Sequence, residues 1–386
     1  MTPQPFTLQV SEADLADLRE RLARTRYPDR APGAPWAFGT DPDWLRGLVA
    51  HWREGFDWRA QEARLGAWPN FRVRMAAFGG VPLHFLHVSG RGPKPLPLLL
   101  AHGWPGSVFE FLDLIPLLAD PAAHGGDAAD AFSLVVPSLP GYGLSFEPGQ
   151  RRFSVEEMAE LLGALMTDVL GYPRYGTQGG DWGAFVTSRL ALVHPERIVG
   201  LHLNLLPLRR DPKLPAASEA EARYLGELKH WLKEETGYQA IQGTRPQTLA
   251  AALTDSPAGL AAWIGEKFRA WSDCDGAIER AIDRDTLLAN ISLYWFTGAI
   301  GSSFWPYWAR MHGPWPIPAE RTIDVPMGYA DFPREILRPP RALADRVFTD
   351  IRRWSAMPKG GHFAALEQPE ALAQEIRAFF APLRIA

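Results

Sequence analysis

One short stretch constrains this chain more than any other: residues 178–184, which read Gln-Gly-Gly-Asp-Trp-Gly-Ala. Small residues stand at Gly179, Gly183 and Ala184, on either side of Asp181. A strand that turns sharply into a helix needs such residues, because the two backbones pass too close for larger side chains. The stretch therefore predicts a strand, a very tight turn with Asp181 at its tip, and then a helix.

This pattern is typical of the nucleophile elbow of α/β-hydrolases, with aspartate where serine usually stands. A serine attacks acyl carbons, whereas a carboxylate can displace a leaving group at an sp³ carbon and become an alkyl ester. The alternative is a loop aspartate that caps the helix starting near Trp182. The motif alone leaves both interpretations open, so the rest of the chain has to decide between them.

The composition is that of an ordinary globular protein. Hydrophobic residues make up 46% of the 386 residues, and the formal net charge of −4 gives no reason to expect nucleic acid as a partner. Cys274 is the single cysteine, which excludes an internal disulfide and a metal site built from cysteines. The N-terminus lacks the features of a signal peptide, and no stretch is apolar enough to span a membrane. We therefore expect a soluble, cytoplasmic protein without a membrane anchor.

The pattern of elements divides the chain into four segments. Residues 1–95 form a helical N-terminal extension that leads into the first strands. Residues 96–207 alternate between strands and helices, which predicts a doubly wound, mostly parallel sheet. Residues 208–320 are mostly helical and rich in aromatic side chains, which predicts a helical cap inserted into the sheet domain. Residues 321–386 complete the core. The expected fold class is α/β, and within it the α/β-hydrolase fold with an inserted cap and an N-terminal extension.

Strands are expected to resume after the cap. The pattern predicts one strand over residues 322–327 and another near residues 347–354, followed by a helix from about residue 369 to residue 380. The 15 Trp and 20 Phe of the chain suggest a large apolar cavity or a heavily packed lid.

Candidates for the remaining catalytic groups follow in the order that this fold requires, nucleophile, acid and histidine. His362 lies in a Gly-Gly-His-Phe loop before the last helix, where a general base would activate water against an ester on Asp181. The acid should follow the strand that ends near Met327, and both Asp331 and Glu335 stand there. Either carboxylate could accept the imidazole N–H, and the spacing does not choose between them.

Residues 102–107, His-Gly-Trp-Pro-Gly-Ser, follow an earlier strand, where this fold places the second donor of an oxyanion hole. The backbone N–H groups of Trp104 and Trp182 would then hold the oxyanion that forms when water attacks the ester carbonyl. The alternative is a glycine-proline turn without function.

An aspartate nucleophile leaves few choices of leaving group. Halide departs unaided, although indole N–H groups help it, whereas an epoxide oxygen needs proton donors because an alkoxide leaves poorly. The cap segment offers four tyrosine hydroxyls, on Tyr224, Tyr238, Tyr294 and Tyr307. Any one of them taken alone is better explained as a packing residue.

Taken together, these motifs resemble the microsomal-type epoxide hydrolases, including the juvenile-hormone-hydrolysing branch and its soluble bacterial relatives, over nearly the whole chain. The segments that carry the resemblance are residues 52–59, 102–107, 179–183, 237–242, 255–260, 294–298 with Tyr307, and 360–363.

The resemblance implies a role for each matching residue. Asp181 matches the nucleophile and His362 the base. The acid of the family follows a Phe-Pro pair, and Glu335 fits that place, so it is preferred to Asp331. Tyr238 and Tyr307 match the two tyrosines that assist ring opening.

The function expected from this resemblance is detoxifying hydrolysis of apolar epoxides to vicinal diols. It proceeds in two steps, through an alkyl ester on Asp181 that water activated by His362 hydrolyses. Trp104 and Trp182 would border the substrate as well as the oxyanion. No metal or organic cofactor is expected, and the partners are a small apolar epoxide and water. The natural substrate, the stereochemical preference, the physiological role and the existence of a homo-oligomer stay open.

Two alternatives compete with this interpretation. A haloalkane dehalogenase shares the Asp-Trp elbow and could use Trp182 as a halide donor, but the tyrosine pair and the N-terminal extension favour the epoxide. A non-catalytic binding protein of the same fold would usually have lost a member of the triad, and none is missing here.

Overall fold

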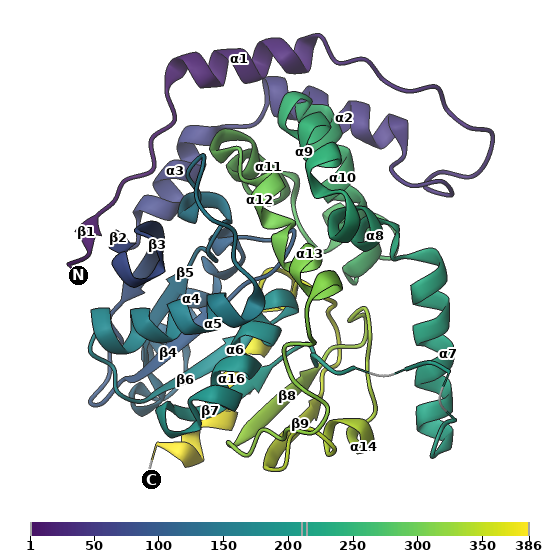
Figure 1. The fold of residues 1–386 in the computed structure, drawn as a ribbon. Coiled ribbons are helices and arrows are strands. Elements are labelled where there is room, and N and C mark those ends of the chain that lie inside the picture. Colours follow the sequence, from purple (N-terminus) through teal and green to yellow (C-terminus); the bar gives the residue numbers. More distant parts are fainter. Residues whose placement is uncertain (1, 210, 214, 385–386) are drawn as a thin grey trace.

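The computed structural model of the protein describes residues 2–209, 211–213 and 215–384. Residues 1, 210, 214, 385 and 386, which belong to the first, third and fourth predicted segments, lie outside the described residues. At the centre is a nine-stranded sheet in the order β1-β2-β3-β5-β4-β6-β7-β8-β9 (Figure 1). The strands are β1 (Gln4–Pro5), β2 (Asn70–Met75), β3 (Val81–Val88), β4 (Leu96–Ala101), β5 (Phe132–Pro137), β6 (Tyr175–Gly179), β7 (Ile198–Leu203), β8 (Met327–Asp331) and β9 (Ile351–Ala356).

The sheet has an antiparallel end and a parallel body. β1, β2, β3 and β5 pair antiparallel in turn, whereas every pair from β5 through β4, β6, β7 and β8 to β9 is parallel. Parallel strands in such a sheet are covered on both faces and read as apolar runs. The predicted doubly wound, mostly parallel sheet is thus confirmed.

β4 shows how the two faces are filled. Leu99 and Ala101 pack in the core cluster with helices α5 (Val155–Ala164) and α6 (Asp181–Val193). The alternate residues Leu98 and Leu100 pack in a second cluster. The second cluster includes residues of helices α4 (Leu114–Ala119) and α16 (Pro369–Phe380). β4 therefore contributes apolar side chains to the core on both faces of the sheet.

Between β7 and β8 the chain leaves the sheet and forms a helical layer that lies above the sheet and to its right in Figure 1. Its helices are α7 (Glu219–Glu234), α8 (Gly237–Thr244), α9 (Pro246–Asp255), α10 (Pro257–Trp271), α11 (Arg284–Thr297), α12 (Ile300–Ser303) and α13 (Trp305–His312). We call this layer the cap. The chain then adds the short helices α14 (Arg341–Ala344) and α15 (Ala364–Glu367). The exact division of the chain at residues 95, 207 and 320 stays a prediction.

The N-terminal extension lies against the cap rather than against the sheet alone. Its helices are α1 (Glu12–Ala23), α2 (Pro42–Glu54) and α3 (Trp58–Gly66), and α1 crosses the top of the molecule in Figure 1. Arg21 of α1 pairs with Asp255 of the cap at 2.8 Å, and His51 Nε2 of α2 lies 2.6 Å from Asp285 Oδ1. The extension therefore braces the cap from outside.

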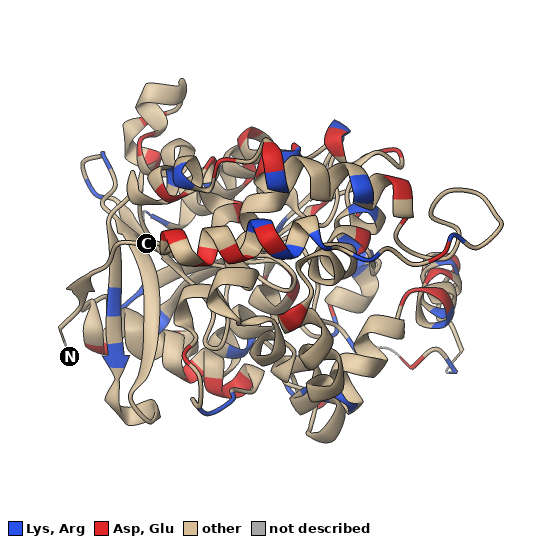
Figure 2. Ribbon diagram, turned by 90° about the horizontal axis from the view of Figure 1, so that it is seen from above, with Lys and Arg blue, Asp and Glu red and all other residues tan. Residues whose placement is uncertain are grey.

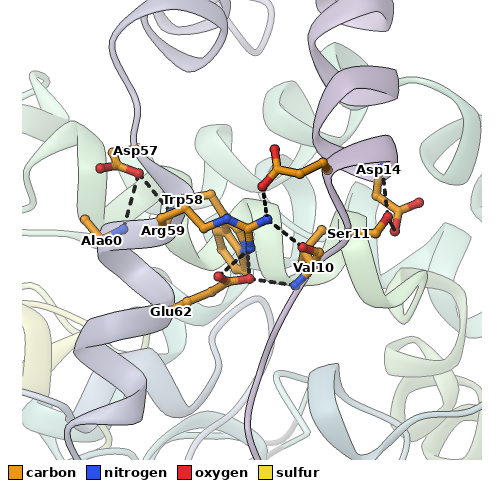
Figure 3. A network of polar contacts seen from close by, with 9 residues as sticks. Val10, Ser11, Asp14, Asp57, Trp58, Arg59, Ala60 and Glu62 are labelled. Carbon is orange, nitrogen blue, oxygen red and sulfur yellow. Dashed lines mark hydrogen bonds and ion pairs between the residues drawn. The ribbon is translucent and has the colours of Figure 1, made fainter.

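A polar cluster fixes the start of α1 to α3 (Figure 3). Glu62 Oε1 accepts hydrogen bonds from Val10 N at 2.6 Å and from Trp58 Nε1 at 2.8 Å. Arg59 Nη1 donates to Glu62 Oε2 at 2.6 Å, and Arg59 Nη2 donates to Val10 O at 2.8 Å. Because the backbone of Val10 is held through both its N–H and its C=O, the path of the chain into α1 is set at this point.

One strand begins later than its pattern predicted. The prediction covered residues 322–327, but β8 covers Met327–Asp331, and upstream only Ile323 forms a single bridge, to Phe348. Pro326 has no N–H to donate to a ladder, so regular pairing cannot extend back through it. The last strand, β9, also begins later than its pattern predicted.

Acidic and basic residues are interspersed along the helices seen from above in Figure 2. Among the helices of the described residues, none combines the length and the apolar character needed to cross a membrane.

Candidate active site

Asp181 stands at the turn between β6 and α6, with a positive φ of 46° that is unusual for a residue with a side chain. The glycines around it leave no room for a Cβ. A Cβ on Gly179 would lie 2.5 Å from the Gly183 backbone, one on Gly183 would lie 1.9 Å from Ala101 O, and one on Gly103 would lie 2.2 Å from Asp181 Oδ1. The tight strand-turn-helix predicted from the sequence is therefore present, and its small residues are required sterically.

His362 joins Asp181 to a buried carboxylate. Its Nδ1 lies 2.6 Å from Glu335 Oε1, and its Nε2 lies 3.5 Å from Asp181 Oδ2. The Glu335 side chain is fully buried, and Glu335 Oε1 also accepts from Ile336 N at 2.7 Å. The other candidate acid, Asp331, is occupied elsewhere, because both of its oxygens accept from Arg338, at 2.6 and 2.9 Å. In the structure it is therefore Glu335, and not Asp331, that contacts His362.

Opposing effects set the pKa of His362. Burial disfavours the imidazolium, but the charges of Glu335 and Asp181 and their hydrogen bonds outweigh burial and hold the pKa well above its usual value. The two carboxylates therefore favour the protonated ring.

The loop that follows β4 reaches Asp181 from the other side. Trp104 N donates to Asp181 Oδ1 at 2.7 Å. Trp182 is the residue after Asp181 and lies in the first turn of α6, where backbone N–H groups have no partner within the helix. Of the two amides predicted to form an oxyanion hole, Trp104 N thus contacts the Asp181 carboxylate, and Trp182 N belongs to the next residue along the chain.

Two of the four candidate tyrosines approach Asp181. Tyr238 of α8 and Tyr307 of α13 are buried, and their ring centroids lie 5.6 Å apart. Both rings pack on the indole of Trp104, at 5.3 and 5.9 Å, and Tyr307 also packs on Trp182 at 4.8 Å. Burial is the main cause that raises the pKa of each hydroxyl. The next cause is the charge of Asp181 for Tyr238 and the charge of Tyr238 for Tyr307. Both hydroxyls therefore keep their protons at neutral pH. Both tyrosines line the same cavity as Asp181.

The other two tyrosines of the cap lie elsewhere. Tyr294 Oη donates to Gly106 O at 2.7 Å, which ties α11 to the loop after β4. Tyr224 lines the large cavity described next.

A cavity of about 480 Å³ extends from Asp181 beneath the cap. Trp182, Tyr238 and Tyr307 form its wall near Asp181. The rest of its wall is mostly apolar and includes Phe185, Leu205, Leu206, Leu208, Leu228, Trp231, Leu232, Met311, Trp315, Ile336 and Leu337. Such a site suits an apolar ligand with one polar end directed toward Asp181.

A second, much smaller cavity of about 20 Å³ lies on the His362 side of Asp181. It is large enough for about one water molecule.

Glu110 faces this small cavity, and sequence reasoning missed this residue. Burial raises the pKa of Glu110 to about 8, and the charge of His362 opposes that shift. A Cβ on Gly106 would collide with the Glu110 carboxylate, so the loop glycine makes room for it. The available signal was a single acid in the apolar run Val-Phe-Glu-Phe, residues 108–111, directly after the loop.

The cap also holds the histidine loop, a connection that the sequence did not reveal. His362 N donates to Trp271 O, at the end of α10, at 2.9 Å. The carboxylate of Glu367 accepts from Asp273 N at 2.7 Å and from Phe363 N at 3.0 Å. The position of His362 therefore depends on the cap as well as on the sheet.

Among the described residues, no group of three or more His, Cys, Asp or Glu side chains could hold a metal ion.

Comparison with known proteins places these features in context. A family described as "Epoxide hydrolase N terminus" matches residues 3–111, and the family described as "alpha/beta hydrolase fold" matches residues 97–262. The chain is 44% identical over 382 residues to a Stigmatella aurantiaca protein provisionally named an epoxide hydrolase, covering 98% of this chain and 85% of that protein. It is 37% identical over 406 residues to epoxide hydrolase 1 of Oryctolagus cuniculus, covering 97% and 88%.

Two solved structures of epoxide hydrolases resemble this structure over nearly the whole chain. The juvenile hormone epoxide hydrolase of the silkworm Bombyx mori superposes with a TM-score of 0.88 at 30% identity, covering 100% of this chain and 95% of that one. The Aspergillus niger epoxide hydrolase superposes with a TM-score of 0.85, also at 30% identity, covering 99% and 97%. The predicted α/β-hydrolase fold is confirmed by these likenesses.

Proposed function

Because this chain belongs to the epoxide hydrolase family and is an epoxide hydrolase, we propose that Asp181 opens the epoxide ring and His362 completes the hydrolysis. The observation that carries the proposal is the position of the Asp181 carboxylate. One side of it meets the apolar cavity beneath the tyrosine pair, and the other meets His362 and the water-sized cavity. The substrate we propose is an apolar epoxide.

In the first step, an oxygen of Asp181 attacks a ring carbon, the C–O bond of the epoxide breaks, and an alkyl ester forms. The oxygen that leaves the carbon gains negative charge. Tyr238 and Tyr307, which still carry their protons, donate hydrogen bonds to it and one of them protonates it. The apolar wall favours this step because it keeps bulk water away from the carboxylate.

In the second step, water attacks the ester carbonyl of Asp181. Ester formation removes the negative charge of Asp181, which is one of the causes that raise the pKa of His362. Its pKa therefore falls when the ester forms, and the neutral ring can accept a proton from water. Glu335 orients the ring, and the backbone N–H groups of Trp104 and Trp182 hold the oxyanion. The diol leaves and the carboxylate is restored.

We propose a further role for Glu110 in this second step. Its carboxyl is neutral below about pH 8 and can donate to, or accept from, a water in the small cavity. With His362 it would hold that water beside the ester. A cytoplasmic location is also a proposal.

Mass spectrometry of the intact protein tests the two steps separately. The His362→Gln variant, exposed to styrene oxide, should gain the mass of one whole epoxide, because ring opening proceeds and ester hydrolysis stalls. Asp181→Asn should gain nothing. A parallel exposure to a bromoalkane tests dehalogenation, which would add only the alkyl group. An adduct with the bromoalkane alone would overturn the assignment, and no adduct with either would return a non-catalytic protein to consideration.

Isotope labelling tests the covalent route in the wild-type protein. In a single turnover in ¹⁸O-labelled water, the first diol should carry unlabelled oxygen drawn from Asp181. Label in that first diol would mean that water attacks the epoxide directly.

A further inference from the structure

Two hydrogen bonds in series connect Arg310 to the hydroxyl of Tyr238. Arg310 Nη2 donates to Gln239 Oε1 at 2.7 Å, and Gln239 Nε2 donates to Tyr238 Oη at 2.9 Å. Tyr238 and Gln239 belong to α8 and Arg310 to α13, two cap helices that pack against each other. All three side chains line the large cavity. This series of contacts therefore runs inside the substrate site.

The chemistry of Arg310 sets the direction of the series. A guanidinium carries only N–H donors, so the Gln239 amide must turn its oxygen toward Arg310. The amide nitrogen then faces Tyr238, and the Tyr238 oxygen accepts from it. The hydroxyl hydrogen of Tyr238 is consequently left for another acceptor. If the amide were free to turn, its oxygen could accept that hydrogen and withdraw it from the substrate.

The surroundings of Arg310 keep it in this position with its charge available. Its Cζ lies 5.4 Å from the ring centroid of Trp182 and 5.6 Å from that of Trp315. Among the described residues, no carboxylate forms an ion pair with it. No ion pair with a described carboxylate therefore offsets the positive charge of Arg310, which acts on the Gln239 amide and, beyond it, on the Tyr238 hydroxyl.

The two tyrosines differ in this respect. Among the described residues, no side-chain amide donates to Tyr307 Oη. Burial and the charge of Asp181 raise the pKa of Tyr238, whereas the Gln239 bond and the charge of Arg310 lower it. For Tyr307, burial is joined by Tyr238 and Asp181, which raise the pKa further, and a hydrogen bond with Trp182 lowers it. Tyr238 is thus the tyrosine whose phenolate would have an amide donor in place.

We propose that Arg310 is a positioning residue for ring opening, which fixes the Gln239 amide so that Tyr238, rather than Tyr307, delivers the proton to the epoxide oxygen. This inference rests on the proposed function. As the bond from Asp181 to carbon forms and the carbon–oxygen bond breaks, the proton moves from Tyr238 to that oxygen. Gln239 Nε2 then donates to the phenolate. The proton released when water hydrolyses the ester restores Tyr238, so the cycle balances.

The test compares Arg310→Met with Arg310→Lys in single turnovers of styrene oxide, a neutral substrate, following formation and breakdown of the ester on Asp181 separately. Methionine should slow ester formation about tenfold and leave its breakdown within about twofold, because proton delivery matters only in the first step. Lysine should recover most of the rate, since an ammonium is also a donor only. Arg223→Met is the matched control, because Arg223 is an exposed arginine of cap helix α7.

Combining Arg310→Met with each tyrosine change locates the effect. In a Tyr238→Phe background the methionine variant should cause no further loss, whereas in a Tyr307→Phe background the tenfold loss should persist. Gln239→Glu should be slower than Gln239→Leu, because a glutamate held by Arg310 still accepts the Tyr238 hydrogen.

Three outcomes would overturn the inference: unchanged ester formation in Arg310→Met, equal losses in both tyrosine backgrounds, or an effect confined to the KM of epoxides that carry a carboxylate. The last would make Arg310 an anion-binding residue instead. Failure of the proposed function would look different, because the wild-type protein itself would then form no ester on Asp181.

Discussion

The two cavities that border Asp181 differ in size and in the residues that line them. On the cap side lies a cavity of about 480 Å³ with mostly aromatic and aliphatic walls. On the other side lies a cavity of about 20 Å³ that Glu110 and His362 border. The two oxygens of the Asp181 carboxylate have different partners. Oδ1 accepts from Trp104 N at 2.7 Å, and Oδ2 lies 3.5 Å from His362 Nε2.

This contrast shows how one residue can serve two reactions with opposite needs. Ring opening needs an apolar substrate and no competing water, because water would solvate the carboxylate and weaken its attack. Ester hydrolysis needs a single water held beside a base. If the contrast is functional, changes on the small-cavity side should affect ester breakdown alone, and changes on the large-cavity side should affect ester formation alone.

The largest expected effect is on the small-cavity side, from Glu335→Gln. The amide can donate to His362 Nδ1, which would leave the ring in the wrong tautomer to accept a proton from water through Nε2. Ester breakdown should fall by about 10³-fold or more, on the scale known for serine-protease triads, while ester formation changes little. Rapid-quench measurement of the accumulated ester would show this. Asp331→Asn is the matched control, and an equal loss there would contradict the assignment of the acid.

A smaller effect on ester breakdown is expected from Glu110, and part of it depends on pH. Glu110→Ala should slow ester breakdown by about tenfold, since one partner of the water is lost. Glu110→Gln stays neutral at every pH. Because the pKa of Glu110 is about 8, ester breakdown in the wild-type protein should decline above that pH while the glutamine variant keeps its rate. Identical pH profiles for the two proteins would exclude a role for this carboxyl group.

On the large-cavity side, Leu228→Trp should reduce the usable volume without touching Asp181. We expect kcat/KM for a bulky epoxide such as stilbene oxide to fall by about tenfold, which is within the range by which pocket fit discriminates substrates. Propylene oxide, a small epoxide, serves as the control in the same variant. If breakdown of the ester slowed as well, the two sides would not be independent.

The smallest expected effect is on stability and again concerns Glu110. Its folded-state pKa of about 8 lies above the ordinary value of 4.5, so between these pH values the folded protein holds a proton that the unfolded chain releases. Stability contributed at this site therefore falls as the pH rises from 4.5 to 8. Glu110→Gln should raise the Tm by a few degrees at pH 8, with the difference vanishing near pH 4.5. Scanning calorimetry at several pH values would measure it, and a difference independent of pH would contradict the assignment.

The sequence by itself determined the features that depend on neighbouring residues. The turn at Asp181 is one, because the clash that Gly179 avoids is with the backbone of Gly183, a few residues further along the chain. The apolar runs of the parallel strands are another, since burial on both faces of the sheet imposes them. The place of His362, in a glycine-containing loop before the last helix, followed from chain order in this fold.

Only the tertiary structure decided which distant side chains meet. Glu335 rather than Asp331 reaches His362 because its side chain turns inward after β8, and spacing along the chain does not specify that direction. The same holds for Tyr238 and Tyr307 among the cap tyrosines, for Glu110, and for the link from Arg310 through Gln239. Hydrogen bonds between side chains require atoms to approach within about 3 Å. That precision comes from the packing of cap, sheet and extension against one another, and a linear pattern of residues does not contain it.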